Sequence, residues 1–512
     1  MKTIRLFAAF ALAFQLANAQ QPGDLDPTFG TNGVAQTVIA DNQSWEADLV
    51  SSVVSLSNGK CLAVGSSRLG STRRVAYVCY NADGTLDSSF GDNGILLVLP
   101  SADLQNYGMD AVELPDGTIY SCGHMFSVAT YETWPFLVKI KNGQLDTSFG
   151  SNGYLIIDIV NALGERMLVQ PDGKIVVGGY LEDNILAMRF NPDGSLDNTF
   201  GENGLSKIVI EGSEDASFVK DLILQPDGKI LLGGFYSTDA TYKWAIVRLG
   251  ANGKLDTTFG EGGIKKMSVG YGHDFVQGIG LQSDGKIVVA GHSWDANLPT
   301  LRYSAAVVRL NADGSQDSTF GSDGIFRKNF TAEGCSYVTD LAVSSEDKIY
   351  VACSPQEFTV YDLGIFSLDK DGNPNATFGD DGYTSTDLEG KEDQSKALAI
   401  QSDGKLLMGV VSYGPNGSPF GVVRYISDIV ISSNAIVTTE QTFVAYPNPV
   451  KDVLNIEFDG NFSIQIFDMA GRMVLTSENI RTIDVKALAA GNYVIKLTSG
   501  DKAYTDRFVK LQ

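Results

Sequence analysis

The sequence predicts an all-β protein built from repeated small sheets, and three observations support this prediction. Variants of a Leu-Asp-x-Thr-Phe-Gly motif occur seven times, with their phenylalanines 51–61 residues apart. A second motif, Gln-Pro-Asp-Gly-Lys-Ile with its variants, occurs seven times at a similar period. No segment shows the 3.6-residue hydrophobic period of an amphipathic helix. Two motifs that recur in phase indicate a repeat architecture.

Each repeat is predicted to form four short antiparallel strands. In one repeat, apolar residues 222–224 precede an Asp-Gly pair and residues 230–232 follow it. Asp-Gly favours a tight hairpin turn, because glycine accepts a positive φ. A variable loop leads to a third strand at 245–249, and a second turn leads through the Phe-Gly motif to a fourth. Four such strands in about 50–60 residues are typical of a propeller blade.

The order of the motifs predicts how the repeats close. The last repeat has a third strand at 421–425 but no Phe-Gly motif after it, whereas the N-terminus carries a spare strand near 33–39. We therefore expect a seven-bladed β-propeller in which the N-terminal strand completes the seventh blade. An open array is the alternative, but it would leave unpaired strand edges.

Four segments are predicted. Residues 1–19 have the basic, apolar and small-residue regions of a signal peptide. Residues 20–426 form the propeller, 427–442 a polar linker, and 443–512 a small β-sandwich, because apolar residues alternate at 453–458 and 463–467. Residues 20–440 hold 28 basic and 53 acidic residues, a net charge of −25, so a nucleic-acid partner is not expected.

Two resemblances add to this prediction. The paired motifs of residues 24–425 resemble the delta-sixty repeat, a bacterial class that implies a propeller fold and no established activity. The tail resembles the type A sorting domain of the type IX secretion system of Bacteroidota, through Pro447, Asn448, Pro449, Gly471, Gly491 and Tyr493. That resemblance implies secretion machinery and a sortase as partners, and a secreted or cell-surface location with anchoring to lipopolysaccharide or release. A carbohydrate-binding sandwich is the alternative.

Residues that recur in most repeats are predicted to be scaffold. Acidic and basic residues each fill one position of the repeat, and we expect them to pair or to cap turns; a charged channel is the alternative. The acidic positions are Asp26, Asp87, Asp146, Asp197, Asp256 and Asp317, and the basic positions are Lys139, Arg189, Arg248, Arg309 and Arg424.

Residues that vary between repeats are better candidates for a ligand site. All three histidines and many aromatic residues fall in loops on the face opposite the Asp-Gly turns, with Tyr107 and Tyr413 near them. The candidate residues for binding a glycan or a protein are His124, Tyr131, Trp134, Tyr236, Tyr242, His273, His292, Trp294 and Tyr303. Packing of these rings between loops, and a three-histidine metal site, are the alternatives.

The sequence indicates no catalytic set, cofactor or metal site. No nucleophile elbow, phosphate loop or dinucleotide fingerprint occurs. The five cysteines do not form the pattern of a disulfide framework. Cys61 and Cys79 could form one disulfide, and buried free thiols are the alternative. We expect a monomeric, non-enzymatic binding module, with a secreted hydrolase or lyase as the alternative.

Overall fold

The computed structural model describes residues 20–39, 48–214, 216–238, 241–270, 272–294, 303–330, 336–357, 360–414, 418–429, 444–448, 450–458, 461–468, 473–489, 491–499 and 502–511. Within these ranges the regular elements are β-strands, and the chain divides into two compact units, Met1–Ile429 and Val430–Gln512. The predicted signal peptide lies outside the described residues. No helix in the described ranges is long and apolar enough to cross a membrane.

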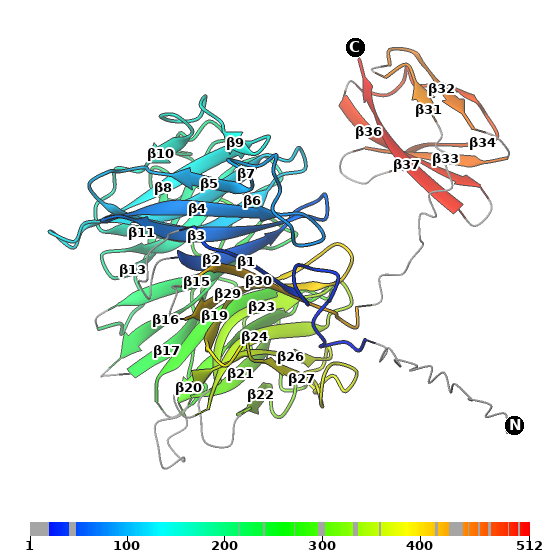
Figure 1. The fold of residues 1–512 in the computed structure, drawn as a ribbon. Coiled ribbons are helices and arrows are strands. Elements are labelled where there is room, and N and C mark those ends of the chain that lie inside the picture. The colour runs from blue at the N-terminus through cyan, green and yellow to red at the C-terminus, as the bar shows by residue number, and fades with distance from the viewer. Residues whose placement is uncertain are drawn as a thin grey trace, which may run out of the picture. The chain divides into compact units, whose positions relative to one another are not determined.

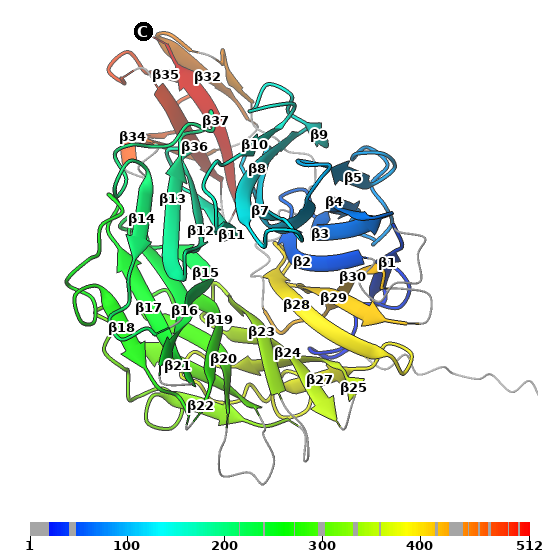
Figure 2. The same ribbon diagram turned by 90° about the vertical axis from the view of Figure 1, so that its left-hand side faces the viewer.

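The first unit contains seven antiparallel sheets of four or five strands, numbered here as sheets 1 to 7 in chain order. They follow one another around a common centre (Figures 1 and 2). The innermost strands are β2 (Asp48–Ser55), β6 (Gln105–Glu113), β11 (Ala162–Val169), β15 (Ser217–Leu224), β19 (Asp274–Leu281), β23 (Ser336–Val343) and β28 (Glu392–Ile400). The second strands are β3 (Cys61–Leu69), β7 (Ile119–Phe126), β12 (Ile175–Leu181), β16 (Ile230–Thr238), β20 (Ile287–Trp294), β24 (Ile349–Glu357) and β29 (Leu406–Tyr413).

The two outer strands of each sheet follow the same order. The third strands are β4 (Thr72–Tyr80), β8 (Thr133–Lys141), β13 (Asn184–Phe190), β17 (Thr241–Leu249), β21 (Tyr303–Leu310), β26 (Leu363–Leu368) and β30 (Phe420–Tyr425). The outermost strands are β5 (Ile95–Val98), β10 (Tyr154–Ile156), β14 (Leu205–Ile208), β18 (Ile264–Met267), β22 (Ile325–Lys328), β27 (Tyr383–Thr386) and β1 (Val34–Thr37). Short strands β9 (Gln144–Leu145) and β25 (Val360–Tyr361) pair with β8 and β24.

The seventh sheet combines the two ends of this unit. Its outermost strand is β1, which pairs antiparallel with β30 so that Val34 lies opposite Val423. Apolar residues of sheets 1 and 7, among them Val50 and Leu407, share one buried cluster. Residues from the start and the end of the unit therefore belong to the same sheet and the same core.

The middle strands are apolar on both faces, because each sheet packs against a neighbour on either side. In β12 the first five residues are all buried, and in β20 the first seven are. Val176 of sheet 3 and Leu232 of sheet 4, for example, lie in one cluster. This two-sided burial explains why these strands appear in the sequence as continuous apolar runs. The Asp-Gly turns between them need glycine, since Gly173 has a φ of 83°.

The repeated charged residues pair with each other and cap turns, as predicted, and the arginine also reaches the next sheet. Asp197 accepts hydrogen bonds from Thr199 and from Arg189 Nε, at 2.7 Å for the latter. The Arg189 guanidinium lies 4.6 Å over the Phe200 ring, and its Nη1 donates to the carbonyl of Ala251 in the next sheet. Burial opposes ionisation of Asp197, but the Thr199 and Lys174 hydrogen bonds and the Arg189 charge hold its pKa well below the ordinary value.

The same pairing recurs for Asp256 with Arg248, Asp317 with Arg309, Asp26 with Arg424 and Asp146 with Lys139. Sheet 6 departs from the pattern, because Asn375 and Ser367 replace the acid and the base. There Asp428, which follows β30, accepts hydrogen bonds from Tyr350, Asn375 and Thr377 and lies 3.0 Å from Lys348. Residues 427–429, predicted as linker, thus pack against sheet 6.

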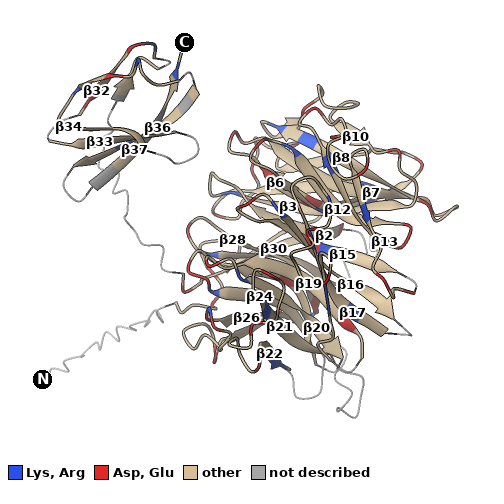
Figure 3. Cartoon of the chain, turned by 180° about the vertical axis from the view of Figure 1, so that it is seen from behind, with Lys and Arg blue, Asp and Glu red and all other residues tan. Residues whose placement is uncertain are grey.

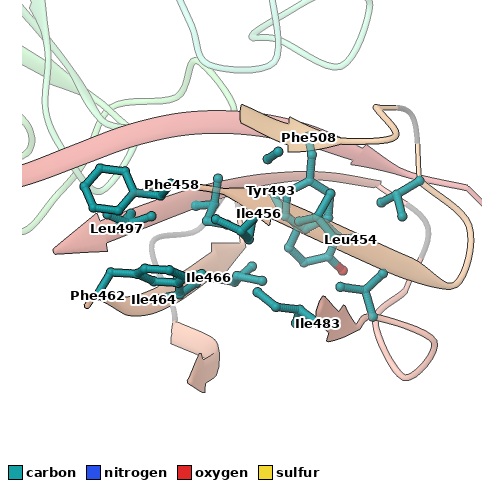
Figure 4. Packing of buried hydrophobic residues seen from close by; sticks show 14 residues of the cluster. Leu454, Ile456, Phe458, Phe462, Ile464, Ile466, Ile483, Tyr493, Leu497 and Phe508 are labelled. Atoms are coloured by element: carbon teal, nitrogen blue, oxygen red, sulfur yellow. The ribbon is translucent and has the colours of Figure 1, made fainter. Parts of the chain in front are cut away.

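The second unit has two sheets around one apolar core. One consists of β31 (Val444–Tyr446), β32 (Val453–Glu457) and β35 (Thr482–Asp484), and the other of β34 (Met473–Glu478), β33 (Ser463–Asp468), β36 (Gly491–Ser499) and β37 (Lys502–Lys510). Leu454 and Ile456 of the first sheet pack with Ile464, Ile466 and Leu497 of the second (Figure 4). Tyr493, one of the predicted sorting residues, is buried in this core and stacks on Phe508. Pro449 and Gly471 lie outside the described residues.

Candidate functional site

Each of the seven innermost strands carries a β-bulge at the same position. The bulged residues are Ser51, Met109, Glu165, Lys220, Gln277, Thr339 and Lys396. A bulge redirects the side chain of its extra residue, and here all seven residues line one cavity of about 700 Å³. The innermost strands surround the centre of the unit in Figure 2.

The cavity wall combines charged, polar and aromatic side chains. Glu165, Arg166, Lys220 and Lys396 are its charged residues. The rings and polar groups come from the first and second strands of several sheets, most of them near one end of the strand, and from β25: Tyr107, His124, Gln277, His292, Tyr337, Ser354, Tyr361, Gln394, Ser395 and Tyr413. These strand ends belong to the face on which the sequence predicted a ligand site.

Several polar groups of the wall have no partner within the described part of the chain. Neither the Glu165 carboxylate nor the Lys220 ammonium group makes a hydrogen bond or ion pair to a described residue. The Nδ1 atom of His124 is buried and has no hydrogen-bond partner there. Unpartnered polar groups around a cavity are available to a ligand.

A layer of charges follows directly after the bulges. Asp110, Asp221 and Asp340 belong to sheets 2, 4 and 6, and each accepts a hydrogen bond from a backbone N–H of the next sheet, donated by Met167, Ile279 and Leu398. Burial raises the pKa of each of these carboxyl groups. Burial would lower the pKa of Arg166, but the three carboxylates raise it. The layer therefore links sheets in pairs and balances the charge of Arg166.

Two of the three histidines line the cavity. His124 stacks on Tyr107 with ring centroids 5.3 Å apart, and burial lowers its pKa. His292 is buried, and its Nδ1 atom lies 3.3 Å from the carbonyl oxygen of Val338. Burial lowers the pKa of His292 to about 4. Both imidazoles are therefore neutral at pH 7. Among the described residues no group of three or more His, Cys, Asp or Glu side chains could hold a metal ion.

Other predicted aromatic residues pack against each other. Tyr242, His273 and Trp294 form a series of ring contacts that continues through Phe275 to His292 and Tyr303. Tyr303 in turn contacts Tyr337 of the cavity wall. Trp134 and Tyr236 pack beside core clusters, and Tyr131 is 77% exposed beside Phe126. Seven of the predicted residues therefore do not line the cavity: Tyr131, Trp134, Tyr236, Tyr242, His273, Trp294 and Tyr303.

The sequence reasoning missed the bulged residues, although a signal was present. Each bulged residue stands nine positions before the lysine position of the Asp-Gly-Lys motif, from Ser51 before Lys60 to Lys396 before Lys405. Their chemical types differ from repeat to repeat, from serine and methionine to glutamate and lysine. Variation at one fixed position of a repeat was therefore the signal for the cavity.

The disulfide considered for Cys61 and Cys79 is wrong, because both are free thiols. Cys61 lies opposite Tyr80 and Cys79 lies opposite Leu62, so the two side chains point to opposite faces of sheet 1. Cys61 packs in the cluster shared with sheet 7 and Cys79 in the cluster shared with sheet 2. The cysteine Cys335 lies outside the described residues.

Comparisons with known proteins identify two families. Residues 444–511 match the secretion system C-terminal sorting domain. Residues 56–90, 170–200, 225–259 and 282–320 match the domain of unknown function (DUF5122) beta-propeller. No curated protein sequence matches the chain.

Solved structures resemble the chain weakly. The polysaccharide lyase Uly1 has a TM-score of 0.45 at 9% identity, covering 74% of this chain and 90% of its own. The α-L-arabinofuranosidase arb93a from Fusarium graminearum has a TM-score of 0.40 at 10% identity, covering 77% and 98%. Drosophila Plexin A in complex with Semaphorin 1b has a TM-score of 0.40 at 9% identity, covering 80% and 88%. With the two family matches, the chain is a β-propeller protein that carries a type IX secretion sorting domain at its C-terminus.

Proposed function

We propose that this chain is an exported binding protein whose ligand site is the cavity lined by the seven bulged residues. The seven sheets are the blades of one closed propeller, and β1 completes the seventh blade. The pairing of β1 with β30 and the cluster shared by sheets 1 and 7 support this closure. Closure places the innermost strand of every blade around one centre, which is what a single central site requires.

The unpartnered polar groups of the cavity carry the proposal. Glu165, Lys220, Gln277 and His124 Nδ1 belong to different strands and border the same space, without partners among the described residues. Buried or half-buried polar groups are costly unless something satisfies them. A ligand that brings its own donors and acceptors would supply these missing hydrogen bonds.

Delivery follows from the tail. The sorting domain supports export through the type IX system to the cell surface or the medium. In this scheme residues 1–19 direct passage across the inner membrane, and the secretion machinery and its sortase recognise residues 443–512. The mature protein acts as a monomer, either released or anchored to lipopolysaccharide, and binds a glycan or a protein outside the cell.

A second candidate function, a hydrolase or lyase, rests on the neutral His124 stacked on Tyr107 in the cavity wall. Either ring could move a proton. Hydrolysis of a glycosidic bond usually uses two carboxylates, and Glu165 is the one carboxylate among the described residues of the wall. We therefore favour binding over catalysis.

A glycan and peptide array probed with the mature protein tests this function. The matched variants are Gln277→Trp, which fills the cavity, and Val209→Trp, which adds the same ring at a site that is 68% exposed. We expect Gln277→Trp to abolish the signals and Val209→Trp to keep them. Equal signals from both variants would contradict a cavity site, and release of shortened glycan from the array would support the enzyme.

A further inference from the structure

The cavity wall carries cationic side chains inside an acidic protein body. Residues 20–440 have a net charge of −25, and acidic residues are spread over the turns of the sheets (Figure 3). The wall instead has three cationic residues, Arg166, Lys220 and Lys396, and one anionic residue, Glu165. Cationic side chains in an otherwise acidic body favour an anionic group of a ligand near them.

The two lysines are the cations available to a ligand. The charge of Arg166 is already balanced by Asp110, Asp221 and Asp340, whose oxygens accept backbone hydrogen bonds. Lys220 has no described partner. Lys396 donates to the side-chain oxygen of Gln394 at 2.7 Å, and Gln394 donates in turn to Glu392. Burial lowers the pKa of Lys396, and the Glu392 charge acts in the opposite direction.

The two lysines occupy different sides of the cavity. Lys220 is the bulged residue of β15 in sheet 4, and Lys396 is the bulged residue of β28 in sheet 7. A ligand that reaches both must therefore extend across the cavity and carry more than one negative group. A single small anion would satisfy only one of them.

The rings of the wall indicate which kind of anionic chain fits. All six rings are tyrosine or histidine, namely Tyr107, His124, His292, Tyr337, Tyr361 and Tyr413. A tyrosine or histidine ring combines a face that suits the apolar side of a pyranose with a polar atom that suits its hydroxyl groups, although Tyr107 and His124 already stack on each other. The aliphatic residues of the wall are few: Leu49, Val50, Met109 and Val338. This composition suits a sugar chain better than the apolar side chains of a peptide.

We infer that the cavity binds an oligosaccharide that carries carboxylate groups, with Lys220 and Lys396 each holding one carboxylate. This inference rests on the proposed function, since it assumes that the cavity is the ligand site. An aromatic ring stacks on the sugar between the two carboxylates. Glu165 and Gln277 accept or donate hydrogen bonds to its hydroxyl groups.

Isothermal titration of the mature protein tests the inference with three probes: an oligogalacturonate, a neutral galactose oligomer and an oligoglutamate peptide. The variants are Lys220→Met and Lys396→Met, which keep an unbranched apolar stem, with Lys207→Met as the matched control. Lys207 lies on the outermost strand β14 and pairs with Glu182 on the surface. We expect oligogalacturonate to bind, each cavity variant to weaken it about tenfold or more, and the control to leave it unchanged.

The outcomes separate the inference from the proposed function. If the neutral oligomer binds as tightly as the uronate and Gln277→Trp abolishes both, the cavity is the site but the inference is overturned. Binding of oligoglutamate without oligogalacturonate also overturns it, as does the absence of binding by oligogalacturonate. If oligogalacturonate binds Gln277→Trp as well as the wild type, the proposed cavity site itself fails.

Discussion

Replacing Asp26 with asparagine tests the contact between the two ends of the propeller unit. Asp26 precedes β1 and is buried, with one oxygen bonded to Thr28 and the other 2.8 Å from Arg424 Nε and 3.1 Å from Lys405. Burial alone would raise its pKa, but these partners lower it to about 2 from 3.8. At about 1.36 kcal/mol per pKa unit, this lowering corresponds to about 2 kcal/mol of stability at neutral pH.

The expected loss for Asp26→Asn is about 2–4 kcal/mol at pH 7, because the buried Arg424 also loses its carboxylate partner. Urea denaturation followed by tryptophan fluorescence measures the loss, and Asp92→Asn, at an exposed site, is the control. The folded pKa lies below the unfolded pKa, so the carboxylate stabilises the fold above about pH 4 and loses this effect as the pH falls toward 2. The unfolding free energies of the wild type and Asp26→Asn should therefore converge as the pH falls. A difference between them below about 0.5 kcal/mol at pH 7, or a difference that persists at pH 2, would refute the reasoning.

Three other predictions follow from the structure. Asp428→Asn should lower the unfolding free energy by about 2 kcal/mol at pH 7, because the contacts of Asp428 with sheet 6 lower its pKa to about 2. Urea denaturation measures this loss, with the exposed Asp380→Asn as the control, and an equal loss in both variants would contradict the prediction. The thiols of Cys61, Cys79, Cys122 and Cys353 should react with a thiol reagent only after unfolding without reductant, because burial raises the pKa of Cys79 to about 12 and raises those of the other three too. The unfolded chain should show five reactive thiols, and three would indicate a disulfide. Deleting residues 441–512 should leave the protein in the periplasm by cell fractionation, and unchanged surface delivery would argue against the sorting role.

The sheets could be predicted from the sequence because each repeat encodes them locally. The turn motif, in most copies Asp-Gly, the apolar runs and the Phe-Gly motif recur at nearly constant spacing. Asp197 pairs with Arg189, as the recurrence of these two positions suggested. Two of the candidate residues that the sequence suggested, His124 and His292, line the cavity. Local patterns of this kind depend on backbone geometry and on nearest neighbours, which a single sequence records.

The cavity residues could not be predicted in the same way. Whether Lys220 points inward depends on a bulge in β15, and a one-residue change of register reverses the direction of every side chain. Asp428 is a second case, because it lies 53 residues from Asn375, where sheet 6 lacks the usual acid. Both features arise from contacts between segments distant in sequence, whereas the repeated scaffold arises from contacts within or between adjacent repeats.

Hydrogen–deuterium exchange of the mature protein with its array-selected ligand tests the central claim most directly. We expect protection of the peptides that contain the innermost strands β11, β15 and β28, around Arg166, Lys220 and Lys396. The Asp-Gly turns around Lys174 and the sorting domain at 444–511 should exchange as in the free protein. Protection confined to those turns or to the sorting domain, with unchanged exchange in the innermost strands, would contradict a ligand site at the centre of the propeller.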